Sequence, residues 1–115
     1  MEYLESHPKL GATWEGFVID QVIGIIGAQI DECFFWATHA GVELDLLIVR
    51  GKDRFGFEVK RTTTPTITPS VRHALSDLNL KRIDIIHSGD YTFQLSNKVR
   101  AVSIKKLLTD LKKIP

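Results

Sequence analysis

Three stretches rich in aromatic and β-branched residues follow one another with breaks too short for anything but turns. They cover residues 33–38, 42–50 and 55–60, and the breaks at 39–41 and 51–54 have lengths typical of hairpins. Connections this short join strands that pair side by side in antiparallel order. The chain is therefore expected to be built on an antiparallel unit of three strands.

An amphipathic helix is predicted ahead of this unit. From about residue 8 to residue 27 the apolar side chains recur at three- and four-residue spacing. Ser6 and Pro8 suit the start of a helix, because a hydroxyl cap and an early proline are both favoured there. Gly24 and Gly27 weaken its far end.

The second half of the chain predicts a crossover. A threonine- and proline-rich loop at residues 62–69 leads to a capped helix near 70–78, and an apolar run at 83–87 reads as a buried strand. Shorter strands are expected at 92–95 and 99–102, and a closing helix at 104–112. This order predicts a single α/β domain over residues 1–115, a sandwich with a mixed sheet whose third and fourth strands are linked through a helix.

Composition and charge narrow the function classes. With 43% hydrophobic and 25% charged residues the chain resembles an ordinary soluble domain, and its net charge of +1 gives no global attraction to nucleic acid or membrane. The longest apolar run, residues 22–30, is too short to span a bilayer, no secretory signal is visible, and the single Cys33 excludes an internal disulfide. We expect a cytoplasmic protein without a membrane partner, for which homodimer formation would add stability.

Charged side chains gather where a strand pattern would place apolar ones. Side chains on a strand alternate between its faces, so Glu43 and Asp45 are expected to share one face of the second strand, and Glu58 and Lys60 one face of the third. The opposite faces are expected to carry the apolar residues Leu44, Leu46 and Ile48, and Phe57 and Val59. Because the two strands are predicted hairpin neighbours, the charged set would converge on one patch.

Two carboxylates on adjacent strands form a suitable oxygen site for Mg²⁺, which uses one or two protein carboxylates together with waters and phosphate oxygens. A lysine beside them would orient a water or stabilise developing negative charge. The alternative is a surface cluster of ion pairs that contributes little to stability. The four histidines lack ligand-like spacing, so a zinc site is not expected.

The dipeptide "LD", a gap of thirteen positions and then "EVK" resemble the active-site motif of the PD-(D/E)XK nuclease superfamily. The resemblance implies a restriction-endonuclease-like α/β/α sandwich with a central mixed sheet: an N-terminal helix, three antiparallel strands, a helix and a strand. It further implies that Asp45 and Glu58, with the Val59 carbonyl, are ligands of Mg²⁺ or Mn²⁺ and that Lys60 is the catalytic lysine.

The upstream helix extends this resemblance through Glu15, whose implied role is to support the metal or a metal-bound water, with Glu43 as an aid. The alternative for Glu15 is a solvated helix position. The sequence departs from the superfamily pattern at Leu44, where a proline is usual.

The segments "HPKLGATWEGFVIDQVI", "GVELDLLI" and "FEVKRT" resemble more closely a domain of unknown function that follows an AAA-type ATPase in many bacterial and archaeal proteins. The resemblance extends from His7 to about Leu111. The chain has no GxxxxGK[ST] phosphate-binding loop of its own. It is therefore expected to be a stand-alone copy or a fragment of an ATPase fusion.

Three functions follow as expectations. The first is a metal-dependent DNA nuclease. Four basic residues expected near the site would contact the nucleic-acid backbone: Arg54, Arg61, Arg72 and Lys9. The alternative for these four residues is an ordinary charged surface. The second is a catalytically silent nuclease-like module that binds nucleic acid or an ATPase domain or subunit. The third is a symmetric dimer that resolves branched DNA.

Overall fold

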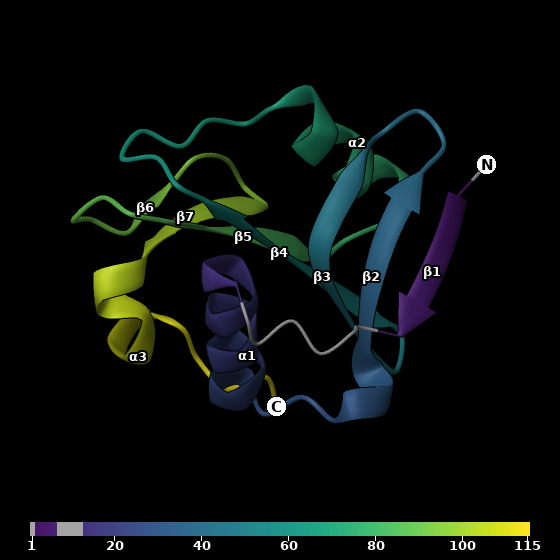
Figure 1. Ribbon diagram of the computed structural model, residues 1–115, viewed down its shortest axis with the longest axis horizontal. Coiled ribbons are helices and arrows are strands. Elements are labelled where there is room, and N and C mark those ends of the chain that lie inside the picture. Colours follow the sequence, from purple (N-terminus) through teal and green to yellow (C-terminus); the bar gives the residue numbers. More distant parts are fainter. Residues whose placement is uncertain (1, 7–12) are drawn as a thin grey trace.

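A computed structural model describes residues 2–6 as backbone and residues 13–115 in full. Its centre is one mixed sheet with the strand order β1-β2-β3-β4-β5-β7-β6 (Figure 1). The bounds of the strands are β1 Glu2–Ser6, β2 Cys33–Thr38, β3 Glu43–Arg50, β4 Asp53–Lys60, β5 Arg82–His87, β6 Phe93–Gln94 and β7 Val99–Ser103. The helical segments are α1 Trp14–Ile26, the 3₁₀ turns Ile30–Glu32 and Ile104–Lys106, α2 Pro69–Asp77 and α3 Leu107–Asp110.

The pairing directions agree with the predicted plan for the central strands. β2, β3 and β4 form an antiparallel unit, and β4, β5 and β7 run parallel. The connection from β4 to β5 passes through α2, so the predicted strand–helix–strand crossover is confirmed. The prediction began the fold with a helix and had no strand before it, whereas β1 precedes α1 and pairs antiparallel with β2.

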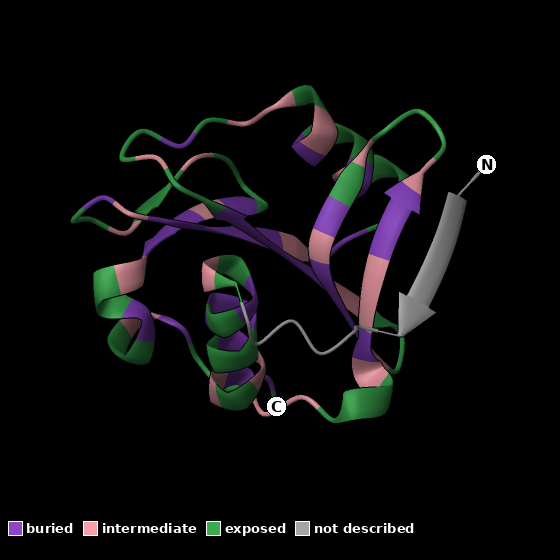
Figure 2. Cartoon of the chain, viewed as in Figure 1, coloured by how far each residue is buried: buried purple, intermediate pink, exposed green. Residues whose placement is uncertain are grey.

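The helices cover both faces of the sheet. Figure 1 shows α1 and α3 on one side and α2 on the other. Apolar side chains of the sheet accordingly form two buried clusters, an α1-side core and an α2-side core. Figure 2 shows that the buried residues follow the central strands and the helix faces that meet them. None of the helices in the described residues is long and apolar enough to cross a membrane.

The start of α1 differs from the prediction, whereas its end agrees with it. Ser6, expected near the start of this helix, is instead the last residue of β1, and residues 7–12 lie outside the described residues. The described helix begins at Trp14, where Thr13 Oγ1 accepts a hydrogen bond from the Gly16 amide at 2.9 Å, so Thr13 is the N-cap. The helix ends as expected at Gly27, which has a left-handed φ of 74°.

The closing helix is shorter than the predicted residues 104–112. A 3₁₀ turn and one turn of α-helix end at Asp110, and the chain then extends. Leu111 and Ile114 are buried in the α1-side core, and the Ile114 amide donates to the Ile26 carbonyl at 3.1 Å. An extended tail lets both side chains reach this core, and that burial prevails over helix propensity.

An ion pair between two side chains holds the C-terminal end of α1 against the sheet. Arg50, the last residue of β3, forms a two-pronged ion pair with Glu32, with N–O distances of 2.9 and 3.0 Å, and donates to the carbonyls of Gly27 and Ile114. Cys33 is buried beside this network, and burial raises the pKa of its thiol to about 11. The network ties β3, α1 and the C-terminal tail together.

Candidate active site

The regular β3–β4 ladder ends at the pair Leu46 and Phe57. Beyond it the Asp45 amide donates to Glu58 Oε1 at 2.8 Å, and the Val59 amide donates to Asp45 Oδ2 at 2.9 Å. Each carboxylate therefore accepts a hydrogen bond from the backbone of the neighbouring strand, where a carbonyl would do so in a continuing ladder.

A bulge in β3 lies at the same point. In the β2–β3 pair the register shifts so that Phe35 lies opposite both Asp45 and Leu46. A bulge of this kind breaks the alternation of side chains along the strand. Leu44 packs in the α2-side core, whereas Leu46 and Ile48 pack in the α1-side core. The prediction that these three side chains share one face is therefore wrong at Leu44.

The predicted site residues line one open depression. It is lined by Glu15, Glu43, Asp45, Glu58, Val59 and Lys60, together with Gly41 and with Ser70 of α2. Its volume of about 290 Å³ is near the lower limit for pockets that hold small ligands. The structure thus brings together residues from α1, β3, β4 and α2.

Lys60 pairs with the nearer carboxylate, because its Nζ lies 3.3 Å from Glu58 Oε2. Half of the Lys60 side chain is exposed, whereas Glu58 is buried. Asp45 Oδ1 has no hydrogen-bond partner among the described residues. Two carboxylate oxygens, Asp45 Oδ1 and Glu58 Oε2, are the acceptors that the backbone does not use.

Burial makes these carboxylates weaker acids. Desolvation, reinforced by the negative charge of Asp45, raises the pKa of Glu58 to about 7. Desolvation also raises the pKa of Asp45, to which Glu15 and Glu43 add like-charge repulsion. The pull of Lys60 lowers both pKa values but does not cancel these effects. Such paired, desolvated carboxyls are typical of functional sites.

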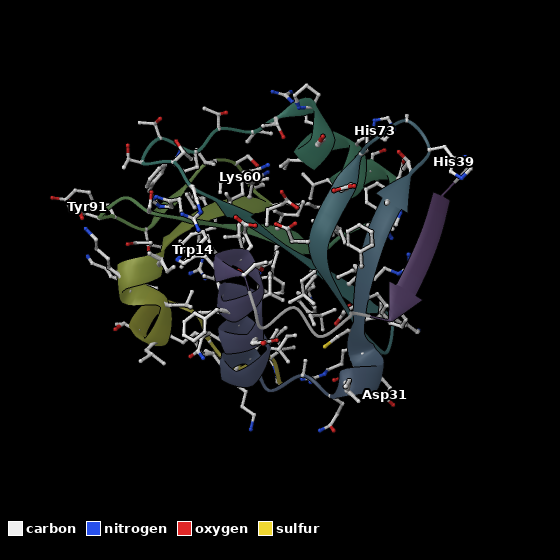
Figure 3. The ribbon with its side chains drawn as sticks, viewed as in Figure 1. Trp14, Asp31, His39, Lys60, His73 and Tyr91 are labelled. Carbon is white, nitrogen blue, oxygen red and sulfur yellow. The ribbon has the colours of Figure 1, made fainter. Side chains whose placement is uncertain are left out.

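Glu15 lies in the first turn of α1, where a negative charge suits the helix dipole. Its Oε1 lies 3.6 Å from Arg61 Nε, and the Arg61 guanidinium lies 4.2 Å from the centre of the Trp14 ring. Trp14 and Lys60, the neighbour of Arg61, are labelled in Figure 3. The start of α1 and the end of β4 are thus joined through Arg61 at the rim of the depression.

The other predicted nucleic-acid contacts fall in different places. Arg54 lies near the opposite end of β4, six residues and about 20 Å from Lys60. Its side chain donates a hydrogen bond to the Leu78 carbonyl at the end of α2. It is therefore not near the site as predicted. Arg72 is exposed on α2, two residues after Ser70. Lys9 lies outside the described residues.

Sequence reasoning did not single out Ser70 as part of this site. The signal that could have found it is topological, since the loop at residues 62–69 must return from the end of β4 to the start of α2. No group of three or more His, Cys, Asp or Glu side chains in residues 13–115 stands close enough to hold a metal ion. The site therefore offers a pair of carboxylates rather than a ready-made cage.

Residues 10–107 match a family described as a domain of unknown function (DUF4143). The chain belongs to this family. Two relatives, the uncharacterized proteins Mb2031c of Mycobacterium bovis and Rv2008c of Mycobacterium tuberculosis, are each 43% identical to it over 106 residues, 92% of this chain and 24% of the relative. The chain thus spans about a quarter of the length of these relatives. No solved structure matches it.

The match confirms the predicted resemblance to a domain of unknown function. The two relatives carry no stated activity. Any chemistry of this site therefore has to be argued from its residues.

Proposed function

We propose that this domain is a divalent-metal-dependent nuclease of the PD-(D/E)XK type that hydrolyses phosphodiester bonds of DNA. The observation that carries the proposal is the convergence of Asp45, Glu58 and Lys60 in one polar depression at the end of the β3–β4 ladder. A sheet with helices on both faces, in which antiparallel strands give way to parallel ones, agrees with a restriction-endonuclease-like sandwich.

The donor set fits Mg²⁺ or Mn²⁺. Asp45 Oδ1 and Glu58 Oε2 are the carboxylate oxygens not bound by backbone amides, and the depression leaves room for waters, which Mg²⁺ retains. Desolvation, and after it the charge of neighbouring carboxylates, raises the pKa values of both residues, and a bound cation would favour the charged form of each. When bound there, the cation would supply a water of lowered pKa and neutralise charge on the scissile phosphate.

The side chains have separate roles in this proposal. Asp45 and Glu58 would hold the cation, with the Val59 carbonyl as the third protein ligand. Lys60, half exposed and next to Glu58, would orient the attacking water and stabilise charge on the phosphate. Glu15 would accept hydrogen bonds from metal-bound water, and its ion pair with Arg61 would hold it at the rim.

The test is cleavage of single-stranded, duplex and branched DNA with Mg²⁺ or Mn²⁺. Asp45→Asn and Lys60→Met preserve side-chain size, and each should lower the rate by about 10²-fold or more. Lys52→Met is the matched control, because Lys52 is an exposed lysine in the turn at the other end of β4. Cleavage that survives both site variants would show that these residues do not carry the activity.

A second candidate is a catalytically silent module that binds an ATPase domain or subunit. The observation that favours it is the Glu58–Lys60 ion pair, which already satisfies an oxygen that a metal would need. The greater length of the relatives leaves room for such a partner in their chains. Calorimetric titration separates the two candidates: Mg²⁺ or Mn²⁺ binding that Glu58→Gln abolishes supports the nuclease, and absence of metal binding supports the silent module.

A further inference from the structure

A second charged region lies at the opposite end of the sheet from the candidate active site. Arg82 begins β5, Lys98 and Arg100 flank the start of β7, and Lys112 belongs to the C-terminal tail. These four cations line one depression, which also presents the side-chain amides of Gln94 and Asn97. Cations and amide donors are the groups that proteins use to bind phosphate oxygens.

A buried carboxylate holds the two arginines of this depression in place. Asp84 is 0% exposed, and its Oδ1 lies 3.3 Å from Arg100 Nε and its Oδ2 3.4 Å from Arg82 Nε. The Arg82 guanidinium also lies 4.9 Å from the centre of the Phe55 ring. Asp84 accepts a hydrogen bond from Arg100, whereas its contact with Arg82 is an ion pair without a hydrogen bond. Both contacts restrain the guanidiniums before any ligand arrives, which lowers the entropy lost on binding.

The arginines keep donors available on the solvent side. The side chains of Arg82 and Arg100 are 38% and 29% exposed, although their Nε atoms face the buried Asp84. A guanidinium has five N–H donors in a planar fork that matches two phosphate oxygens at once. The contacts with Asp84 involve only the Nε atoms, and the terminal nitrogens of Arg82 and Arg100 form no hydrogen bond among the described residues. Both arginines line the depression.

A neighbouring depression extends the cationic region. It shares Arg82 and Lys112 with the first and adds Lys81 and Lys113. We call the surface formed by these six residues the cationic edge: Lys81, Arg82, Lys98, Arg100, Lys112 and Lys113. The side-chain carboxylates that line the same two depressions are those of Asp53, which pairs with Lys81, and Asp84. Because the whole chain has a net charge of only +1, this positive charge is local.

We propose that the cationic edge binds the phosphodiester backbone of a nucleic-acid strand. The two depressions share Arg82 and Lys112, and the six cations of the cationic edge are more than one isolated phosphate would contact, so they fit several phosphates of a strand better. Binding of this kind is independent of base sequence, since its contacts go to phosphates.

The cationic edge is separate from the candidate active site. Arg82 begins β5 and His87, which pairs with Lys60, ends it five residues further on, a distance of about 17 Å. None of the six residues lines the depression that holds Asp45 and Glu58. The proposal therefore extends the DNA-directed function to a second surface without requiring hydrolysis.

The experiment measures fluorescence anisotropy of a labelled single strand of about 20 nucleotides, titrated with the protein in EDTA at several salt concentrations. Lys98→Glu/Lys112→Glu reverses the charge of two exposed side chains that form no ion pair with Asp84, so folding should be preserved. Affinity should fall at least about tenfold, and the slope of log affinity against log salt should flatten by about 1.4, the value for two lost phosphate contacts.

The matched control is Lys105→Glu/Lys106→Glu, which reverses two exposed lysines beyond the other end of β7. It should change affinity less than twofold. Equal losses in both double variants would show that only net charge matters and would overturn the proposal. Unchanged affinity in Lys98→Glu/Lys112→Glu would overturn it as well.

Inorganic phosphate serves as the second probe, because a free phosphate and a nucleic-acid backbone share the same chemistry. Phosphate that binds the wild type while the oligonucleotide does not would overturn the assignment to a strand. Since EDTA prevents metal-dependent cleavage, the titration measures binding alone, whether or not the domain hydrolyses DNA. A failed nuclease assay would leave this result intact, so the two proposals are tested separately.

Discussion

The backbone amide of Asp45 and the Glu58 carboxylate are joined by a 2.8 Å hydrogen bond across the point where the β3–β4 ladder ends. The reciprocal bond runs from the Val59 amide to Asp45. Both carboxylates are therefore structural acceptors as well as candidate ligands. Replacing either with alanine would leave a half-buried amide without a partner, at a cost of about 1–3 kcal/mol. Amide variants, which keep an acceptor oxygen, are the better tools.

Metal binding by Asp45 and Glu58 should raise the thermal stability of the domain. We expect Mg²⁺ or Mn²⁺ well above its dissociation constant to stabilise the folded domain by about 2–4 kcal/mol. Asp45→Asn and Glu58→Gln should remove most of this gain. Glu43→Gln is the control, because the Glu43 side chain lines the depression but forms no hydrogen bond among the described residues. Thermal melts with metal and with EDTA measure the effect, and an equal gain in all three variants would contradict it.

Stability of the metal-free domain should fall as the pH rises through neutrality. The pKa of Glu58 is raised from 4.5 to about 7, so its contribution is fully present below the ordinary carboxyl pKa and is lost as pH rises through 7. The loss should be no more than about 3 kcal/mol. Glu58→Gln should show a weaker pH dependence in urea unfolding from about pH 5 to pH 8. A wild type that gains stability relative to this variant over that interval would refute the assignment.

Glu32 is expected to give the opposite dependence of stability on pH. Hydrogen bonds from the Arg50 guanidinium, with help from the Gln29 amide, lower the pKa of Glu32 to about 2. Its contribution is therefore present above the ordinary carboxyl pKa and is lost as pH falls towards 2. Glu32→Gln should unfold at lower temperature than the wild type at neutral pH, and the difference should shrink on acidification. Asp31→Asn, an exposed neighbour, should follow the wild type; if it behaves like Glu32→Gln, the Arg50 pair is not the cause.

Gly56 should not tolerate a methyl group. A Cβ at this position would lie 2.9 Å from side-chain atoms of Ile83 and Leu80 and 3.2 Å from one of Leu44. Gly56→Ala should therefore destabilise the domain by about 1–3 kcal/mol through overpacking of the α2-side core. Gly24→Ala is the matched control, because nothing lies within 4 Å of a Cβ there and alanine favours a helix by about 0.5–1 kcal/mol. Urea midpoints that shift in the same direction for both variants would contradict this reasoning.

Local patterns in the sequence predicted the centre of the fold well. The bounds of β2 agree residue for residue with the predicted 33–38, and the bounds of β3, β4, α2 and β5 agree within two residues. These elements depend on short-range signals: β-branched runs, hairpin-length breaks and capped helix starts. The thirteen-residue spacing between Asp45 and Glu58 likewise predicted their meeting, since it is set by one hairpin.

Features that depend on distant partners were missed. β1 exists as a strand by pairing with the edge of β2, and the bulge at Asp45 arises from its register with Phe35. The cationic edge combines segments 81–82, 98–100 and 112–113, which no local pattern connects. The prediction that Arg54 lies near the site failed because Arg54 and Lys60 are near opposite ends of one extended strand, β4. Tertiary pairing decides each of these features.

Because Cys33 is buried, chemical labelling of its thiol reports unfolding of the domain. Its thiol donates to the Gln29 carbonyl at 3.3 Å and has a pKa raised to about 11, so very little thiolate exists at neutral pH in the folded state. A thiol reagent should therefore label the chain only in molecules that have opened around β2. Because the chain has one cysteine, the labelled fraction counts those openings directly, without a probe having to be engineered.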